Sequence, residues 1–403
     1  MLQVLYGFSQ GVYWMTFCST LSFASSYITS MGYTTTQLGI MVAIANVIAA
    51  PVQQIVANAA DRAKKITLAK IMVIWLSILA LSNGMMSFLG EGSKVLPALF
   101  MLSAIIIMLV QPLENALAFR IEGAGKSLNF GLCRSMGSVF FSIVSSFLGW
   151  LAAQSGTRMI PRTAMVLAIL YVVTVFVIDV LLEKEKRKIN ASNLSNNAST
   201  SAGQSDGVER TLKEFLEKYK YFFIFLVGTV GFTFGHIVIN NYIYQITANV
   251  GGNDVDMGRL LSVQAIVELP TMALFANINK RFKTSSLIKF AAIFFVIKNA
   301  LTLLAGSLPV LYFAMLFQML AFAMYIPASV KYVNDIMDER DAVKGQSFVT
   351  VAYTISSAFA AIFGGVLIDN LGVTSTLLVC LFVAIAGMTV SILSLNRYEK
   401  KND

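Results

Sequence analysis

The sequence is poor in charged residues, and it contains only three cysteines and one histidine. Asp, Glu, Lys and Arg make up 13% of the 403 residues, about half of their usual share in soluble domains, which excludes an ordinary soluble fold. Cys18, Cys133 and Cys380 are odd in number and lie in apolar stretches, which argues against a disulfide framework or a metal cluster. We therefore expect small buried cysteine side chains, no metal and no other cofactor.

Long apolar runs dominate the chain, of which 57% is hydrophobic. A helix needs about 20 apolar residues to cross the hydrocarbon core of a bilayer, and helices are the expected form because these runs lack the alternation of barrel strands. The first run lacks a basic segment before it and exceeds a signal-peptide core, so we expect it to be a retained span. The predicted spans are 4–28, 37–59, 67–89, 95–119, 128–152, 163–182, 221–246, 257–279, 285–306, 309–334, 343–368 and 373–395.

The basic residues predict the orientation of these twelve spans. With a cytoplasmic N-terminus, 22 of the 30 Lys and Arg residues fall in inner loops and the C-terminal tail, against four in outer loops. The positive-inside rule then puts both termini in the cytoplasm, and we expect a multi-pass protein of the cell membrane. The net charge of +9 follows from this topology and needs no nucleic-acid partner.

Two segments of the chain follow one plan. Residues 39–65 and 258–284 superpose without a gap at an offset of 219, which pairs Gly39 with Gly258 and Pro51 with Pro270. The offset places the second predicted span on the eighth. We therefore expect two copies of one six-helix unit, running parallel to each other.

A polar linker separates the two predicted copies. Residues 184–220 are rich in Asn, Ser and Lys and cannot bury a core, so we expect disorder, with a short amphipathic helix over 211–220. The expected organisation is an N-terminal bundle at 1–183, the linker, and a C-terminal bundle at 221–403. The fold class is an all-α membrane protein with twelve transmembrane helices in two pseudo-symmetric six-helix bundles.

Ionisable side chains inside predicted spans mark candidate functional sites, because burying them in the membrane is costly. Glu114 and Arg134 share a depth near the inner end of their spans, and Glu268 and Lys298 share a depth near the midplane. Pairing within each couple would relieve the cost, and a polar solute or a proton could compete for either partner. An ion pair that only joins neighbouring helices is the alternative.

Further polar and aromatic residues in the spans could line a polar cavity. His236, the single histidine, lies near the midplane with Asn240 one turn on; its ordinary pKa suits a proton relay, although a hydrogen bond to a neighbouring helix would equally explain it. The other candidates are Gln111, Asn115, Gln264, Gln318, Tyr242, Tyr244, Phe141 and Tyr325.

Two short motifs suggest enzymes but lack the context that enzymes need. GFSQG at 7–11 matches G-x-S-x-G, yet it lies in a span and not at a strand-to-helix turn. GAGKS at 123–127 resembles a phosphate-binding loop, but Arg120 stands where the loop requires Gly. No span carries a metal-ligand or nucleophile–base spacing, so we do not expect an enzyme.

Several stretches resemble the major facilitator superfamily, and within it the group of lactose permease and other oligosaccharide–proton symporters. The loop after the second span, NAADRAKK, is similar to the superfamily's conserved loop motif through Asp61 and Arg62, with Arg281 in the equivalent loop of the second half. NFGLCRSMGSVFF at 129–141 resembles the permease F-G-x-x-R-x-x-G stretch. This resemblance implies that Arg134 binds the solute and that an aromatic ring at Phe141 stacks beside it.

The resemblance extends to the remaining candidates. PLENAL resembles the segment with the sugar-binding carboxylate, matched by Glu114 or by Asn115, and VELP matches an essential glutamate through Glu268. Lys298 takes the place of an arginine and keeps its charge. The tenth span has neither the His nor the Glu that lactose permease uses for proton coupling, which leaves Glu268 and His236 as the proton-coupling candidates, or a facilitator without coupling.

These observations predict a transporter that imports a sugar, oligosaccharide or nucleoside together with a proton by alternating access. The expected partners are the solute, a proton or another cation, and the lipid bilayer, and we expect a monomer. Export of amphipathic compounds is the alternative within the class, because 19 Met and 29 Phe could form an apolar cavity. A non-transporting membrane scaffold or sensor is the alternative outside it.

Overall fold

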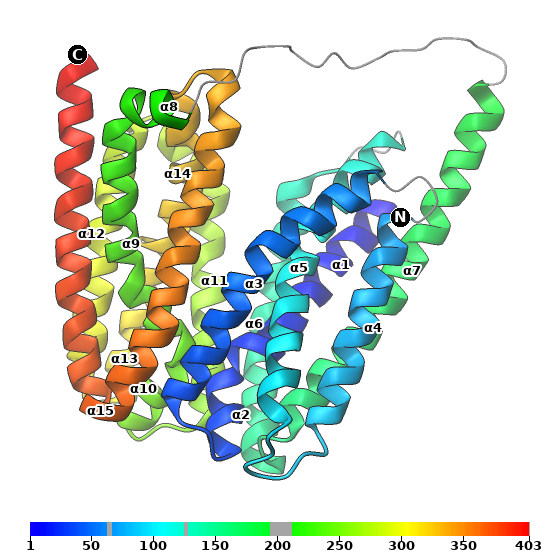
Figure 1. Ribbon diagram of the computed structural model, residues 1–403, viewed down its shortest axis with the longest axis horizontal. Coiled ribbons are helices and arrows are strands. Elements are labelled where there is room, and N and C mark those ends of the chain that lie inside the picture. The colour runs from blue at the N-terminus through cyan, green and yellow to red at the C-terminus, as the bar shows by residue number, and fades with distance from the viewer. Residues whose placement is uncertain (63–66, 125–127, 194–211, 403) are drawn as a thin grey trace. The chain divides into compact units, whose positions relative to one another are not determined.

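The protein is built from helices, and the computed structural model describes residues 1–62, 67–124, 128–193 and 212–402 (Figure 1). No strand occurs among these described residues. The chain forms two compact units. The first comprises Met1–Tyr33 and Ile44–Gln204, and the second comprises Thr34–Ala43 and Ser205–Asp403.

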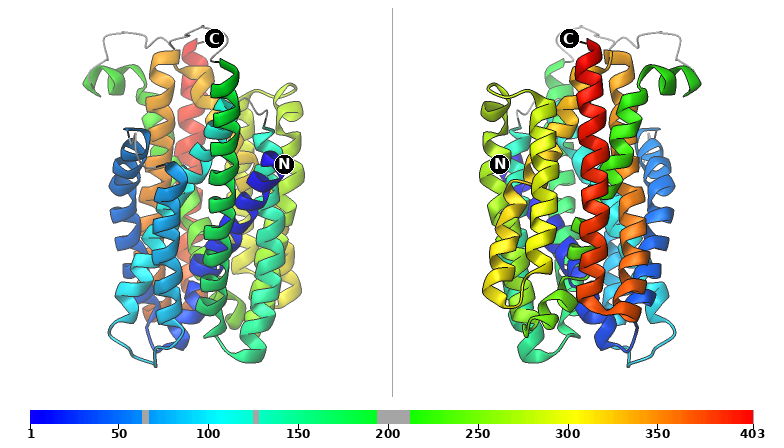
Figure 2. Two further views of the ribbon diagram at one scale, coloured as in Figure 1. Left: turned by 90° about the vertical axis from the view of Figure 1, so that its right-hand side faces the viewer. Right: turned by 90° about the vertical axis from the view of Figure 1, so that its left-hand side faces the viewer.

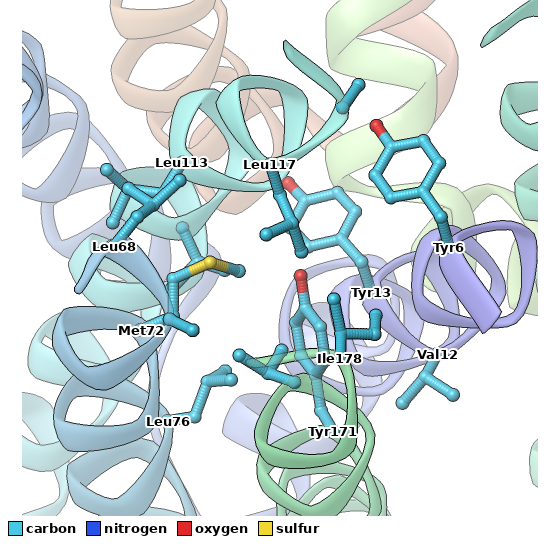
Figure 3. Close-up of a cluster of buried hydrophobic side chains, with 14 of the residues drawn as sticks. Tyr6, Val12, Tyr13, Leu68, Met72, Leu76, Leu113, Leu117, Tyr171 and Ile178 are labelled. Atoms are coloured by element: carbon cyan, nitrogen blue, oxygen red, sulfur yellow. The ribbon is translucent and has the colours of Figure 1, made fainter. Parts of the chain in front are cut away.

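The first unit holds the helices before the linker. They are α1 (Leu2–Phe17), a π-helix (Cys18–Ser22), α2 (Ala24–Ser30), most of α3 (Thr35–Arg62), α4 (Leu68–Met86), α5 (Leu96–Gly123), α6 (Phe130–Ser155) and α7 (Met159–Asn193). Their core is a cluster of buried aliphatic side chains and tyrosines contributed by α1, α4, α5 and α7 (Figure 3). Tyr6, Tyr13 and Tyr171 are the largest side chains in it.

The first predicted span is not one regular helix. The π-helix Cys18–Ser22 follows α1, and the amide of Phe23 donates to the carbonyl of Cys18, five residues earlier, at 3.2 Å. Irregular turns of this kind inside a helix occur frequently at functional sites. Ser19 and Thr20 are buried within it.

The second unit holds the helices after the linker. They are α8 (Leu212–Lys218), α9 (Lys220–Asn241), α10 (Ile243–Asn249), α11 (Asp254–Asn279), α12 (Thr284–Leu303), α13 (Leu308–Leu316), a 3₁₀ helix (Phe317–Met319), α14 (Phe322–Ile336) and α15 (Glu339–Asn402). Helix α15 changes direction at Gly372, where φ is +77°. Its C-terminal part packs beside α12 (Figure 2), and helix α8 confirms the short amphipathic helix predicted at the end of the linker.

Ten helices in the described part of the chain are long and apolar enough to cross a membrane. Bulky apolar side chains such as Phe119, Val227 and Phe382 are exposed on them, which suits a surface that faces lipid. Helix α1 ends at the π-helix and is not among these ten, and α15 is one of them although it contains two predicted spans. The total of twelve spans therefore remains a prediction.

The two segments with a shared plan form similar helices. Helix α3 begins at Thr35 and α11 at Asp254, which are 219 residues apart, and each helix contains its proline, Pro51 or Pro270, in its interior. The start of α11 is capped by Asn253, whose side chain accepts from the amides of Val255 and Asp256. The equivalent turn of α3 receives its cap from α15, as described below.

Candidate functional site

Glu114 lies in the core of the first unit, where hydroxyl groups surround it. Its Oε2 accepts hydrogen bonds from Tyr171 on α7 at 2.6 Å and from Ser9 on α1 at 3.1 Å. Tyr6 on α1 donates to the backbone carbonyl of Glu114 at 3.2 Å. Figure 3 shows the hydroxyl of Tyr171 directed toward the turn of α5 that carries Leu113 and Leu117.

The Glu114 side chain is 1% exposed, and its second oxygen, Oε1, is buried without a hydrogen-bond partner among the described residues. Three helices, α1, α5 and α7, are tied together at this carboxyl group. The anticipated pairing of Glu114 with Arg134 is therefore wrong, since the partners of the carboxyl group are hydroxyls.

Arg134 makes a different contact in the same unit. Its guanidinium carbon lies 4.1 Å from the centre of the Trp14 ring on α1, within the range of a cation–π interaction. The sequence predicts an aromatic ring beside Arg134 and identifies it as Phe141. Trp14 provides the ring, and Phe141 is half-buried further along α6.

The second unit contains a buried polar network centred on Lys298 of α12. The Lys298 ammonium is fully buried and donates to Gln264 Oε1 at 3.0 Å and to Gln318 Oε1 at 2.6 Å. The amide nitrogen of Gln318 in turn donates to Glu268 Oε1 at 2.7 Å. Lys298 and Glu268 are therefore joined, as anticipated, but through the Gln318 amide.

This arrangement explains how a membrane protein keeps a lysine in its interior. Amide oxygens satisfy two of the three ammonium protons, and the carboxylate at the far side of Gln318 supplies opposite charge. Gln264 and Glu268 lie one turn apart on α11, while the irregular 3₁₀ segment between α13 and α14 presents Gln318. The half-buried Glu268 is therefore held on the side of α11 that faces the buried Gln318.

His236 on α9 is 1% exposed and stacks on Phe322, with ring centroids 5.0 Å apart. Asn240 Nδ2 lies 3.1 Å from His236 Nε2, so Nε2 accepts in a neutral imidazole and the ring proton is on Nδ1. Within the described residues, His236 Nδ1, Gln264 Nε2 and Asn299 Oδ1 are buried without partners. These three atoms give the second unit unused hydrogen-bonding capacity.

The remaining predicted residues lie outside these contacts. Asn115 is half-buried on α5, next to Glu114, and Arg281 is exposed in the turn between α11 and α12. Asp61 and Arg62 end α3, but their side chains lie outside the described residues. In the described part of the chain, no three His, Cys, Asp or Glu side chains group as metal ligands would.

Sequence reasoning missed three residues of these sites. Trp14, Ser9 and Tyr171 all contact residues that were predicted, but none of the three carries a charge that would single it out within an apolar span. Helical periodicity gives the exposed and buried faces of one helix and does not say which neighbouring helix supplies the partner. A signal existed for Trp14 alone, because tryptophan occurs only three times in the chain.

The family model described as "MFS_1 like family" matches residues 1–379. The chain belongs to the MFS_1-like family of the major facilitator superfamily. It is therefore an integral membrane protein with several spanning helices. No curated protein matches the sequence.

Solved structures share the major facilitator fold of this MFS_1-like protein. A crystal structure of the nucleoside transporter NupG matches with a TM-score of 0.75 and 16% identity, covering 98% of this chain and 99% of that one. A peptide transporter POT in complex with alafosfalin matches with a TM-score of 0.72 and 11% identity, covering 99% and 94%. A bacterial homolog of the human lysosomal transporter Spinster matches at 0.69 and 10%, covering 99% and 97%.

Proposed function

We propose that the protein is a secondary transporter that moves a small polar solute together with a proton by alternating access. The observation that carries the proposal is the buried Lys298–Gln318–Glu268 network. Charged side chains inside membrane helices are costly to bury, and proteins therefore retain them mainly where function needs them. The named transporters of similar fold, which carry nucleosides or peptides, support a polar solute.

Nucleosides are the solute class that we favour, followed by sugars and oligosaccharides. NupG is a nucleoside transporter, and its structure covers nearly the whole chain. A nucleoside offers both donors and acceptors, which would complement the unpartnered His236 Nδ1, Gln264 Nε2 and Asn299 Oδ1 of the second unit.

Each unit contributes its own solute-binding groups in this proposal. Arg134 serves the first unit, and Glu268 and Lys298 serve the second, with Glu268 also accepting the transported proton. His236 is the second proton-coupling candidate, because its Nδ1 is buried without a partner among the described residues. Solute roles for Glu114, Asn115 and Phe141 remain predictions, and for Glu114 its enclosure by Ser9 and Tyr171 favours a structural role.

The finer topology is also a proposal. Twelve spans in two parallel repeats are supported by α3 and α11, which begin 219 residues apart and share an interior proline. The distribution of Lys and Arg supports cytoplasmic termini. The segments around residues 61–62 and 281 would then be equivalent cytoplasmic turns.

Export of amphipathic compounds is less well supported. It requires an apolar cavity, yet the large aromatic side chains Phe232, Phe295 and Tyr325 of the second unit are at most 1% exposed and pack against one another. These rings form a core. An exporter would need a cavity that is lined by other Phe and Met residues.

The test is initial-rate uptake of radiolabelled uridine, adenosine and lactose in cells that lack their own carriers. We expect nucleoside accumulation that an uncoupler abolishes, and loss of accumulation in Glu268→Gln and Lys298→Met. Lys289→Met is the matched control on α12. Lys289 does not belong to the network and forms an ion pair with Glu399, with 2.7 Å between Nζ and Oε2. Accumulation that survives the uncoupler excludes proton drive, and normal uptake in both network variants contradicts the site.

A further inference from the structure

Trp14 and Arg134 meet at a tight crossing of α1 and α6. A Cβ atom on Gly11 would lie 2.0 Å from the Phe140 ring, and one on Gly7 would lie 2.8 Å from the sulfur of Met136. Both distances are shorter than Cβ contacts in proteins allow, so the two glycines permit this approach. Trp14 is three residues beyond Gly11, close to the same face of α1.

Gly137 provides the space for the indole on the other side of the crossing. A Cβ atom at Gly137 would lie 2.4 Å from Cδ1 of Trp14 and 3.1 Å from both Cγ and Nε1. Arg134 is one turn before Gly137 on α6, and its guanidinium lies over the same indole at 4.1 Å. The glycine and the arginine of the NFGLCRSMG stretch thus contact one side chain.

The indole is itself held in place by its own helix. Tyr13 packs edge-on to Trp14 at 5.2 Å, and the Phe17 ring lies 5.2 Å away, one turn on. A ring fixed by aromatic neighbours and seated on a glycine is a rigid surface. A guanidinium that rests on such a surface loses much of the freedom of its long side chain.

We propose that Trp14 is the positioning residue for Arg134, and that Gly137 is required because it admits the indole. The proposal rests on the proposed function in one respect, the binding of solute by Arg134. Trp14 fixes the plane of the Arg134 guanidinium before the solute binds. Binding then avoids the entropic cost of ordering this side chain. The two glycines of the stretch then differ in role, because a Cβ atom at Gly131 meets only Asn129 Oδ1, at an ordinary 3.7 Å.

The experiment compares Trp14→Leu, Trp14→Phe and Gly137→Ala with two controls, Gly131→Ala on the same helix and Trp150→Leu at an exposed tryptophan of α6. Three quantities are measured on the full chain. They are the KM and maximal rate of uridine uptake, the thermal stability of the purified protein, and the rate at which phenylglyoxal modifies Arg134 relative to Arg162, read by mass spectrometry.

We expect Trp14→Leu and Gly137→Ala to raise the KM about fivefold or more, with a smaller change in maximal rate, because a cation–π contact of about 1 kcal/mol is lost. Phenylglyoxal should modify Arg134 faster in both variants while the rate at Arg162 stays constant. Trp14→Phe should restore most of both properties, since a ring remains. The two controls should match the wild type.

Two results would overturn the proposal. One is an unchanged Arg134 modification rate in both Trp14→Leu and Gly137→Ala. The other is equal acceleration at Arg134 and Arg162 together with lower thermal stability, which would mean general loosening. If the wild type does not carry uridine, the proposed function fails for that solute, whereas the modification rates still decide the role of Trp14.

Discussion

Thr35 and Asp369 are 334 residues apart in sequence, yet the backbone amide and the hydroxyl of Thr35 both donate to Asp369 Oδ1, at 3.2 and 2.6 Å. The amide of Thr36 donates to Asp369 Oδ2 at 2.7 Å. All three residues belong to the second unit. A carboxylate of α15 therefore caps the first turn of α3, where amides lack partners and the helix dipole favours negative charge.

Replacing this cap should lower stability in a pH-dependent way. Burial alone would raise the pKa of the Asp369 carboxyl, but the hydrogen bonds from Thr35 and Thr36 outweigh it and hold the pKa below its ordinary value. Such a group stabilises the fold above its unfolded pKa of about 4, and the contribution is lost as the pH falls through the lower folded value. We expect Asp369→Asn to cost about 1 kcal/mol at neutral pH, because the negative charge at the N-terminus of α3 is lost.

Thermal unfolding of purified wild type and Asp369→Asn between pH 3 and pH 7 measures this effect. The difference between the two proteins should be largest at neutral pH and should shrink below about pH 4. Asn370→Ala is the control, since the neighbouring Asn370 side chain donates to the carbonyl of Val366 in its own helix and does not cap α3. A difference that stays constant across this range would show that the carboxylate charge is not what caps α3.

The carboxyl group of Glu114 should contribute more to stability than to transport. Tyr171→Phe removes the 2.6 Å hydrogen bond to a buried acceptor, which typically costs about 1–2 kcal/mol. Tyr13→Phe is a matched control in the same core, where the hydroxyl makes a long bond of 3.4 Å to a carbonyl. Chemical unfolding in detergent should separate the two variants clearly.

Glu114→Gln tests the other half of this argument. The amide oxygen can still accept from Ser9 and Tyr171, so we expect a folded protein with near-normal uptake. A variant that folds normally but no longer accumulates solute would instead restore the solute-binding role that the sequence predicts for Glu114.

The architecture followed from the sequence because lipid leaves few alternatives. Apolar runs of membrane length must be helical, and each helix longer than 18 residues lies within or over a predicted span. Depth along a span is also readable, since rise per residue is fixed, and the shared depth of Lys298 and Glu268 agrees with the network in which Gln318 joins them. What failed was the choice of partner across helices. Sequence spacing does not reveal that Glu114 meets Tyr171 of α7 and not Arg134 of α6.

The irregular segments were equally invisible in the sequence. The 3₁₀ helix that presents Gln318 lies within an apolar run without a glycine or proline at the break, and tertiary packing decides its geometry. The π-helix Cys18–Ser22 likewise has no local signal. Gln318, which connects Lys298 with Glu268, lies where the helix deviates from regularity, and hydropathy averages over such positions.

Gln318 should be indispensable although it carries no charge. In Gln318→Leu, Lys298 keeps Gln264 as its one remaining hydrogen-bond partner among the described residues. Glu268 loses an amide donor, so both charges become harder to bury. We expect uptake to fall about tenfold or more, as measured by initial rates normalised to protein in the membrane. Gln346→Leu is the control, because Gln346 is half-buried on α15 and its side chain donates to the carbonyl of Val330. Equal loss in the two variants would contradict a specific role for Gln318.

Helix α8 is attached to the second unit by an aromatic side chain and by an ion pair, and the two should differ in importance. Phe215 is fully buried, stacks on Phe348 at 5.7 Å and packs against Tyr219 at 5.0 Å, so Phe215→Ala should destabilise the unit by about 3–5 kcal/mol. Lys218 lies 2.7 Å from Asp338, but both side chains are more than a third exposed, and Lys218→Ala should cost less than about 1 kcal/mol. Thermal unfolding at low and high salt distinguishes the two contributions, since salt weakens only the ion pair. If Lys218→Ala proved the more damaging variant, the docking of α8 would be electrostatic, and the buried ring would be a consequence of that docking and not its cause.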